Sequence, residues 1–252
     1  MRIVIQDWQP GQSQLDSAPV NSDENDTPPG GLLETVELET GPSPTAAVIW
    51  LHGLGADGHD FEPIVPELHL GAAGPVRFVF PHAPVRPVTI NGGMPMRAWY
   101  DIIGIDRESP QDEPGIRASA QKVEIMIRRE IGRGIPANRI ILAGFSQGGA
   151  IALHLGLRFG ESLAGIMALS TYLPLHESLG DEHSEANAAT PLFMAHGILD
   201  PVVPLYLGES SANRLVQGGW PVTWRTYTMP HAVCPDEIRD ISGFLADRLA
   251  VA

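Results

Sequence analysis

The chain has 252 residues, of which 43% are hydrophobic, enough to build the core of one large domain or two small ones. Its formal net charge of −14 makes it a poor partner for nucleic acid or for an anionic membrane surface. Cys234 is the only cysteine, which excludes an internal disulfide, and no apolar run has the length of a secretory leader or a membrane span, so we expect a cytoplasmic protein without stable membrane insertion.

Residues 1–31 differ in composition from the rest of the chain. They hold five acidic residues against the single Arg2, are rich in Ser, Gln and Pro, and end in two prolines and two glycines. Such a composition buries too little apolar surface to fold by itself. We therefore predict an acidic, disordered tail over residues 1–31 and one folded domain over residues 32–252.

Apolar runs of strand length recur along this domain. They lie at residues 46–51, 77–80, 139–143, 165–169, 192–195 and 222–227. Several are apolar at consecutive positions, which is typical of parallel strands buried between two layers of helices.

Helical periods separate these runs. Apolar residues step by three or four from Ile116 to Ile131, and again from Ile238 to Leu249. The alternation of strands and helices predicts an α/β fold with a mostly parallel central sheet flanked by helices. In such folds, ligands bind beyond the carboxyl ends of the strands.

The segment Gly144-Phe-Ser-Gln-Gly148 matches the pattern G-x-S-x-G. An apolar strand leads into it and an apolar-periodic helix leads out of it, which is the setting of a nucleophile elbow in the α/β-hydrolase fold. The sharp turn lifts the serine hydroxyl out of the sheet, and the helix start behind it favours a developing oxyanion. We predict Ser146 as the nucleophile; a chance match in an ordinary turn is the alternative.

A serine hydroxyl needs a base, and in this fold the acid and the histidine follow the serine in that order. Asp200 lies in the loop after the run 192–195, and His231 follows the run 222–227. We predict that His231 takes the proton of Ser146 and that Asp200 orients the imidazole. The alternatives are a turn aspartate before Pro201 and a surface histidine. His196 ends its strand too early to be the base.

The first predicted strand ends in His52-Gly-Leu-Gly55, a segment suited to supply an oxyanion N–H. We predict the backbone N–H groups of Leu54 and Gln147 as the oxyanion hole. His52 is either a second candidate base or a brace for this loop. Candidate walls of an acyl cleft are Met96, Trp99, Leu173 and Leu175, for which core packing is the alternative. The His, Asp and Cys residues have no zinc-like spacing, so no metal or cofactor is predicted.

Five segments resemble a known family over roughly residues 45–249. They are Leu51-His-Gly-Leu-Gly-Ala-Asp-Gly58, Phe80-Pro-His-Ala-Pro84, Asn91-Gly-Gly-Met-Pro-Met-Arg-Ala-Trp-Tyr-Asp101, Gly144-Phe-Ser-Gln-Gly-Gly149 and His196-Gly-Ile-Leu-Asp-Pro-Val-Val-Pro204. The family is that of small bacterial carboxylesterases related to acyl-protein thioesterases and lysophospholipases.

The resemblance implies a triad of Ser146, Asp200 and His231, an oxyanion hole at Leu54 and Gln147, and a substrate groove bordered by residues 94–99. It implies no cofactor, and homodimers are common in the family. The chain departs from the family in having Pro230 before His231, where the family has glycine, and in its long acidic tail. Proline should stiffen the histidine loop.

These features predict a serine hydrolase that cleaves small-molecule or lipid esters or thioesters of short to medium acyl chains through an acyl-enzyme. No long hydrophobic lid segment is visible, which argues against a triglyceride lipase. The alternatives are a dienelactone- or polyester-type hydrolase on the same fold, and a non-catalytic binding protein that kept the scaffold.

Overall fold

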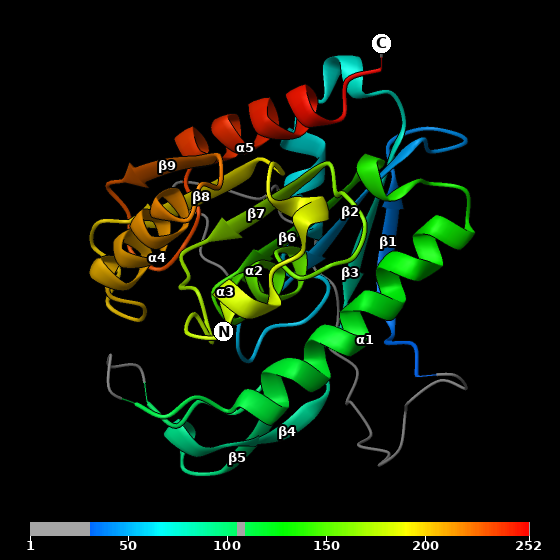
Figure 1. Ribbon diagram of the computed structural model, residues 1–252. Coiled ribbons are helices and arrows are strands. Elements are labelled where there is room, and N and C mark those ends of the chain that lie inside the picture. The colour runs from blue at the N-terminus through cyan, green and yellow to red at the C-terminus, as the bar shows by residue number, and fades with distance from the viewer. Residues whose placement is uncertain (1–30, 105–108, 252) are drawn as a thin grey trace.

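The computed structural model describes residues 31–104 and 109–251. Its centre is a seven-stranded sheet in the order β1-β3-β2-β6-β7-β8-β9 (Figure 1). The strands are β1 (Thr35–Glu39), β2 (Ala46–Leu51), β3 (Val76–Pro81), β6 (Ile140–Phe145), β7 (Gly165–Leu169), β8 (Leu192–Gly197) and β9 (Val222–Tyr227). Only the edge strand β1 is antiparallel to its neighbour, which confirms the predicted mostly parallel sheet. The predicted tail lies outside the described residues except for Gly31.

Helices cover both faces of the sheet, with α5 on one side and α1 and α2 on the other (Figure 1). The helices are α1 (Glu113–Gly132), α2 (Gln147–Gly156), α3 (Leu179–Glu182), α4 (Leu205–Gln217) and α5 (Pro235–Arg248). Short 3₁₀ turns are η1 (Glu62–Glu67), η2 (Gly71–Ala73), η3 (Thr89–Asn91), η4 (Ala137–Arg139) and η5 (Glu185–Asn187). Within residues 31–104 and 109–251, no helix combines the length and apolarity needed to cross a bilayer.

Alternate residues of each central strand enter two separate cores. In β2, Ala47, Ile49 and Leu51 pack with α1 and α2. The intervening residues Ala46, Val48 and Trp50 pack with α5 and η1 on the opposite face. This period of two follows from the pleat of a strand, and it explains why strands buried on both faces are apolar throughout.

A separate hairpin pairs β4 (Val85–Val88) with β5 (Met94–Arg97) and projects away from the main sheet (Figure 1). The apolar runs did not predict this hairpin, because each of its strands contains a proline and is largely exposed. Its position matters for the site, since Met96 reaches the cavity described below.

Candidate active site

Ser146 stands at a strained turn between β6 and α2. Its backbone angles, φ 54° and ψ −120°, lie outside the regions that L-residues prefer. A Cβ at Gly144 would lie 2.3 Å from the carbonyl of Gly148, and one at Gly148 would lie 2.4 Å from the carbonyl oxygen of Leu51. Strand and helix therefore approach too closely for any residue but glycine at these two positions. This is the geometry of a nucleophile elbow.

Asp200 and His231 form a short hydrogen bond at the same edge of the sheet. The distance between His231 Nδ1 and Asp200 Oδ2 is 2.6 Å, and their side chains are 7% and 0% exposed. The other carboxylate oxygen, Oδ1, accepts the N–H groups of Val202 and Val203, each at 2.8 Å. Burial raises the pKa of Asp200, but these hydrogen bonds outweigh burial and hold it below its usual value. Asp200 is thus a buried, ionised acceptor for the imidazole.

The imidazole of His231 lies beside the turn that carries Ser146. Its ring packs on that of Phe145, with centroids 4.6 Å apart, and Phe145 directly precedes Ser146. Because Nδ1 donates its proton to Asp200, Nε2 is left as the basic nitrogen. Among the described residues, neither Nε2 of His231 nor the Ser146 hydroxyl forms a hydrogen bond.

The chain segments that lead to Asp200 and to His231 are packed directly against each other. A Cβ at Gly197 would lie 2.3 Å from the carbonyl oxygen of Met229 and 2.5 Å from that of Pro230. The N–H of Leu199 also donates to the Met229 carbonyl, at 3.1 Å. With proline at position 230, the imidazole is still directed at Asp200.

Leu54 and Gln147 line the same cavity as Ser146. Gln147 is the first residue of α2, where backbone N–H groups have no acceptor within the helix. Its side chain is fixed from both ends, because Oε1 accepts the Trp99 N–H at 2.8 Å and Nε2 donates to the Tyr100 carbonyl at 2.6 Å. Leu54 and Gln147 therefore both border the space in front of Ser146.

His52 is a brace and not a base. Its Nδ1 donates to the Gly53 carbonyl at 2.7 Å, and its Nε2 accepts the Ala83 N–H at 3.0 Å. Burial lowers its pKa to about 4, so the ring is neutral at physiological pH. Both ring nitrogens are occupied, and the ring holds the loop that carries Leu54.

The cavity at Ser146 has a volume of about 420 Å³. Met96 lies in its wall, as the sequence suggested. Sequence reasoning missed several other lining residues, namely Gly55, Ile90, Asn91, Tyr100, Ile102, Tyr172, Val202 and Val203. Of these, Val202 and Val203 could have been found, because they follow the predicted acid by two and three residues.

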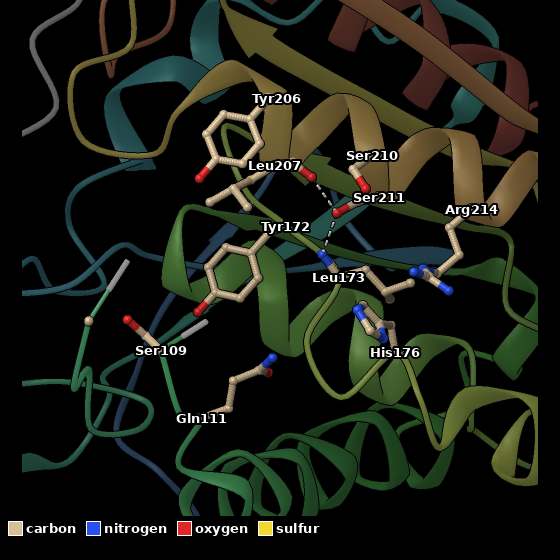
Figure 2. A pocket seen from close by; sticks show the side chains of 11 residues that line it. Ser109, Gln111, Tyr172, Leu173, His176, Tyr206, Leu207, Ser210, Ser211 and Arg214 are labelled. Atoms are coloured by element: carbon tan, nitrogen blue, oxygen red, sulfur yellow. Dashed lines mark hydrogen bonds between the residues drawn. The ribbon is translucent and has the colours of Figure 1, made fainter. Parts of the chain in front are cut away.

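Three predicted wall residues lie elsewhere. Trp99 is fully buried and donates its indole N–H to the His52 carbonyl at 2.9 Å, so it supports the loop behind the cavity instead of lining it. Leu173 belongs to a neighbouring cavity of about 130 Å³ (Figure 2). Leu175 borders a more open depression beyond it. Leu173 and Leu175 follow β7, where the chain leaves the cavity at Ser146 after Tyr172.

Tyr172 separates the two cavities, since it lines both. Its hydroxyl is hydrogen-bonded to that of Tyr100 at 2.9 Å. On the far side, Figure 2 shows Leu173 tied to α4, where the Ser211 hydroxyl accepts its N–H at 2.8 Å. Hydrogen bonds at Tyr172 and at Leu173 therefore fix the wall between the two cavities.

The seven-stranded sheet, the strained serine and the histidine–aspartate pair at one sheet edge define an α/β-hydrolase. A family profile described as Phospholipase/Carboxylesterase matches residues 34–249. The chain belongs to this family, and it is a hydrolase that acts on esters or thioesters.

Curated relatives and solved structures agree with this assignment. The chain is 43% identical to acyl-protein thioesterase 1 of Neurospora crassa, with 81% of this chain and 87% of that protein covered. It is 39% identical to acyl-protein thioesterase 1 of Mycosarcoma maydis, with 85% and 96% covered. The crystal structure of Arabidopsis thaliana SOBER1 superposes with a TM-score of 0.77 at 30% identity, over 81% of this chain and 99% of that one. Zea mays acyl-protein thioesterase 2 gives the same TM-score at 28% identity, over 86% and 99%.

Proposed function

We propose that Ser146, His231 and Asp200 form a catalytic triad that hydrolyses carboxylic esters or thioesters of short to medium acyl chains. The observation that carries the proposal is the 2.6 Å hydrogen bond between His231 and the buried Asp200, beside the strained elbow at Ser146. The bond between serine and histidine commonly tightens only when substrate is bound, so its absence in the free enzyme is compatible with this role.

The reaction begins when Nε2 of His231 takes the proton of Ser146 and the serine oxygen attacks the acyl carbonyl. The carbonyl oxygen becomes an oxyanion that accepts the N–H groups of Leu54 and Gln147. The tetrahedral intermediate collapses, and the leaving alcohol or thiol receives the proton from His231. A water molecule, activated by the same imidazole, then releases the acid from Ser146.

The cavity supports an acyl group of this size. Its walls are mostly apolar, with Ile90, Met96 and Ile102 on one side and Val202 and Val203 near the acid loop. Tyr172 ends this apolar space, and the cavity beyond it is lined by Gln111, His176 and Arg214. A long saturated chain would have to enter this smaller cavity of about 130 Å³ and remove Gln111, His176 and Arg214 from water, which disfavours it. The relatives named as acyl-protein thioesterases support a thioester as one substrate class.

A fluorophosphonate probe tests the triad. We expect labelling of the wild-type protein at Ser146 and none of the Ser146→Ala variant. Asp200→Asn should lower kcat by about 10³- to 10⁴-fold, because the imidazole is then held in the wrong tautomer. An unlabelled wild-type protein would favour a non-catalytic binding protein, and a p-nitrophenyl ester series with its rate maximum beyond C12 would contradict the chain-length proposal.

The cellular setting is part of the same proposal. The lone cysteine, Cys234, supports a reducing compartment such as the cytoplasm. A homodimer is also part of the proposal, and size-exclusion chromatography with light scattering measures it directly.

A further inference from the structure

His196 is a fully buried histidine at the end of β8 that the reaction scheme above does not use. Its ring is held from two sides. The ring of Trp224 from β9 packs against it with centroids 6.1 Å apart, and a Cβ at Gly208 of α4 would lie only 2.5 Å from its Nδ1. The imidazole is therefore fixed in both position and orientation.

The Nε2 atom of His196 faces two acceptors. It lies 2.9 Å from the carbonyl oxygen of Val203 and 3.4 Å from Oδ2 of Asp200. Since neither of these atoms can donate a proton, Nε2 must carry the hydrogen. Its Nδ1 is buried and has no hydrogen-bond partner within residues 31–104 and 109–251, so a second proton there would be unsatisfied.

The ring consequently stays neutral. Burial lowers the pKa of His196, with His231 adding to the effect, while the Val203 carbonyl and the Asp200 and Glu209 carboxylates oppose it without reversing it. A neutral donor supplies a dipole without neutralising Asp200, so the carboxylate keeps its charge for the imidazolium of His231.

His196 also holds the turn that holds Asp200. Val203 accepts from His196 through its carbonyl and donates its own N–H to Oδ1 of Asp200. A displacement of Val203 would therefore release one of the two N–H groups that fix the carboxylate. His196 acts on Asp200 both through this turn and through its direct approach to Oδ2.

We propose that His196 is a positioning residue, which anchors the turn at Val203 and directs an N–H at Oδ2 so that Asp200 presents this oxygen to His231. The inference rests on the proposed triad. It concerns a residue that touches neither substrate nor the reacting atoms, so its contribution should be seen in kcat and not in KM.

Two substitutions of similar polarity separate this role from simple packing. In His196→Gln the amide nitrogen is three bonds from Cβ, like Nε2, and can reach Val203 and Asp200. In His196→Asn it is only two bonds from Cβ and falls short. We expect Gln to keep kcat within about threefold and Asn to lower it by about 10- to 100-fold, with KM unchanged in both.

Thermal unfolding accompanies the kinetics, because a buried site tolerates substitution poorly. If Asn does not yield folded protein, Gly208→Ala replaces it, since the new methyl group displaces the ring from its seat. Equal kcat for the Gln and Asn variants, or a loss confined to KM, would overturn the proposal. The triad is judged separately by Ser146→Ala and Asp200→Asn, so the positioning role can fail while the triad stands.

Discussion

Glu237 is fully buried in the first turn of α5, shortly after His231 in the chain. Both of its carboxylate oxygens are buried, and no side chain among the described residues donates a hydrogen bond to either. Burial raises its pKa well above 4.5; a hydrogen bond with the Cys234 backbone opposes this rise without reversing it, and the nearby Asp240 adds to it. The folded protein therefore binds a proton here that the unfolded chain releases above about pH 4.5.

This proton makes stability depend on pH in a predictable direction. A raised pKa in the folded state stabilises the fold fully at low pH, and the stabilisation is lost as the pH rises above 4.5. Glu237→Gln removes the titration, so we expect its melting temperature to match that of the wild type near pH 4 and to exceed it increasingly between pH 5 and 8. The exposed Glu67→Gln is the control, and identical melting curves for Glu237→Gln and wild type at pH 8 would refute the expectation.

The sequence predicted some residues of the candidate site better than others. The proposed triad of Ser146, Asp200 and His231 could be selected from the sequence, because each residue follows a recognisable strand and the fold sets their order along the chain. The cavity wall was less accessible. Trp99 and Leu173 are apolar and close in sequence to site segments, yet the direction of a side chain from a loop depends on tertiary packing that no periodicity records.

At the level of elements, the contact between β2 and α2 is set by glycine. Gly148→Ala would place a methyl group 2.4 Å from the Leu51 carbonyl oxygen and 2.6 Å from that of His52. The helix would have to move away from the strand, so we expect the free energy of unfolding to fall by about 1–3 kcal/mol. Because the helix start carries Gln147, activity should fall with it.

Gly243→Ala is the matched control for this prediction. Gly243 lies in the middle of α5, is exposed, and has open space where its Cβ would be. Alanine there should stabilise the protein by about 0.5–1 kcal/mol, because it restricts the unfolded chain and favours the helix. Urea unfolding of both variants measures the two effects, and a neutral Gly148→Ala would show that α2 can yield without cost.

Elements differed in how well their sequence defined them. Strands β2, β7 and β9 were predicted at their observed bounds, because an apolar run or a β-branched run ends where the strand ends. The edge strand β1 was missed, since its sequence TVELE alternates polar with apolar residues and one of its faces is exposed to solvent. Short strands with prolines, such as β4 and β5, give no run at all.

At the scale of the whole molecule, the described strands, both cores and the cavity at Ser146 are formed by residues 31–104 and 109–251. Removal of residues 1–30 takes away five acidic residues and Arg2 but no part of this framework. We expect kcat/KM of the shortened protein to stay within about twofold of the wild-type value. Steady-state kinetics on an uncharged ester measures this, and a loss beyond tenfold would mean that the acidic segment takes part in catalysis.

The close packing of Gly197 against the carbonyls of Met229 and Pro230 has a consequence for how such a site can change. Asp200 and His231 lie 31 residues apart in the chain, yet no side chain fits at Gly197 where the segments that carry them meet. A longer loop at Asp200 would displace His231, and a shifted loop at His231 would break its hydrogen bond to Asp200. Evolution or design must therefore rebuild both loops together, whereas the walls of the substrate cavity remain free to vary one side chain at a time.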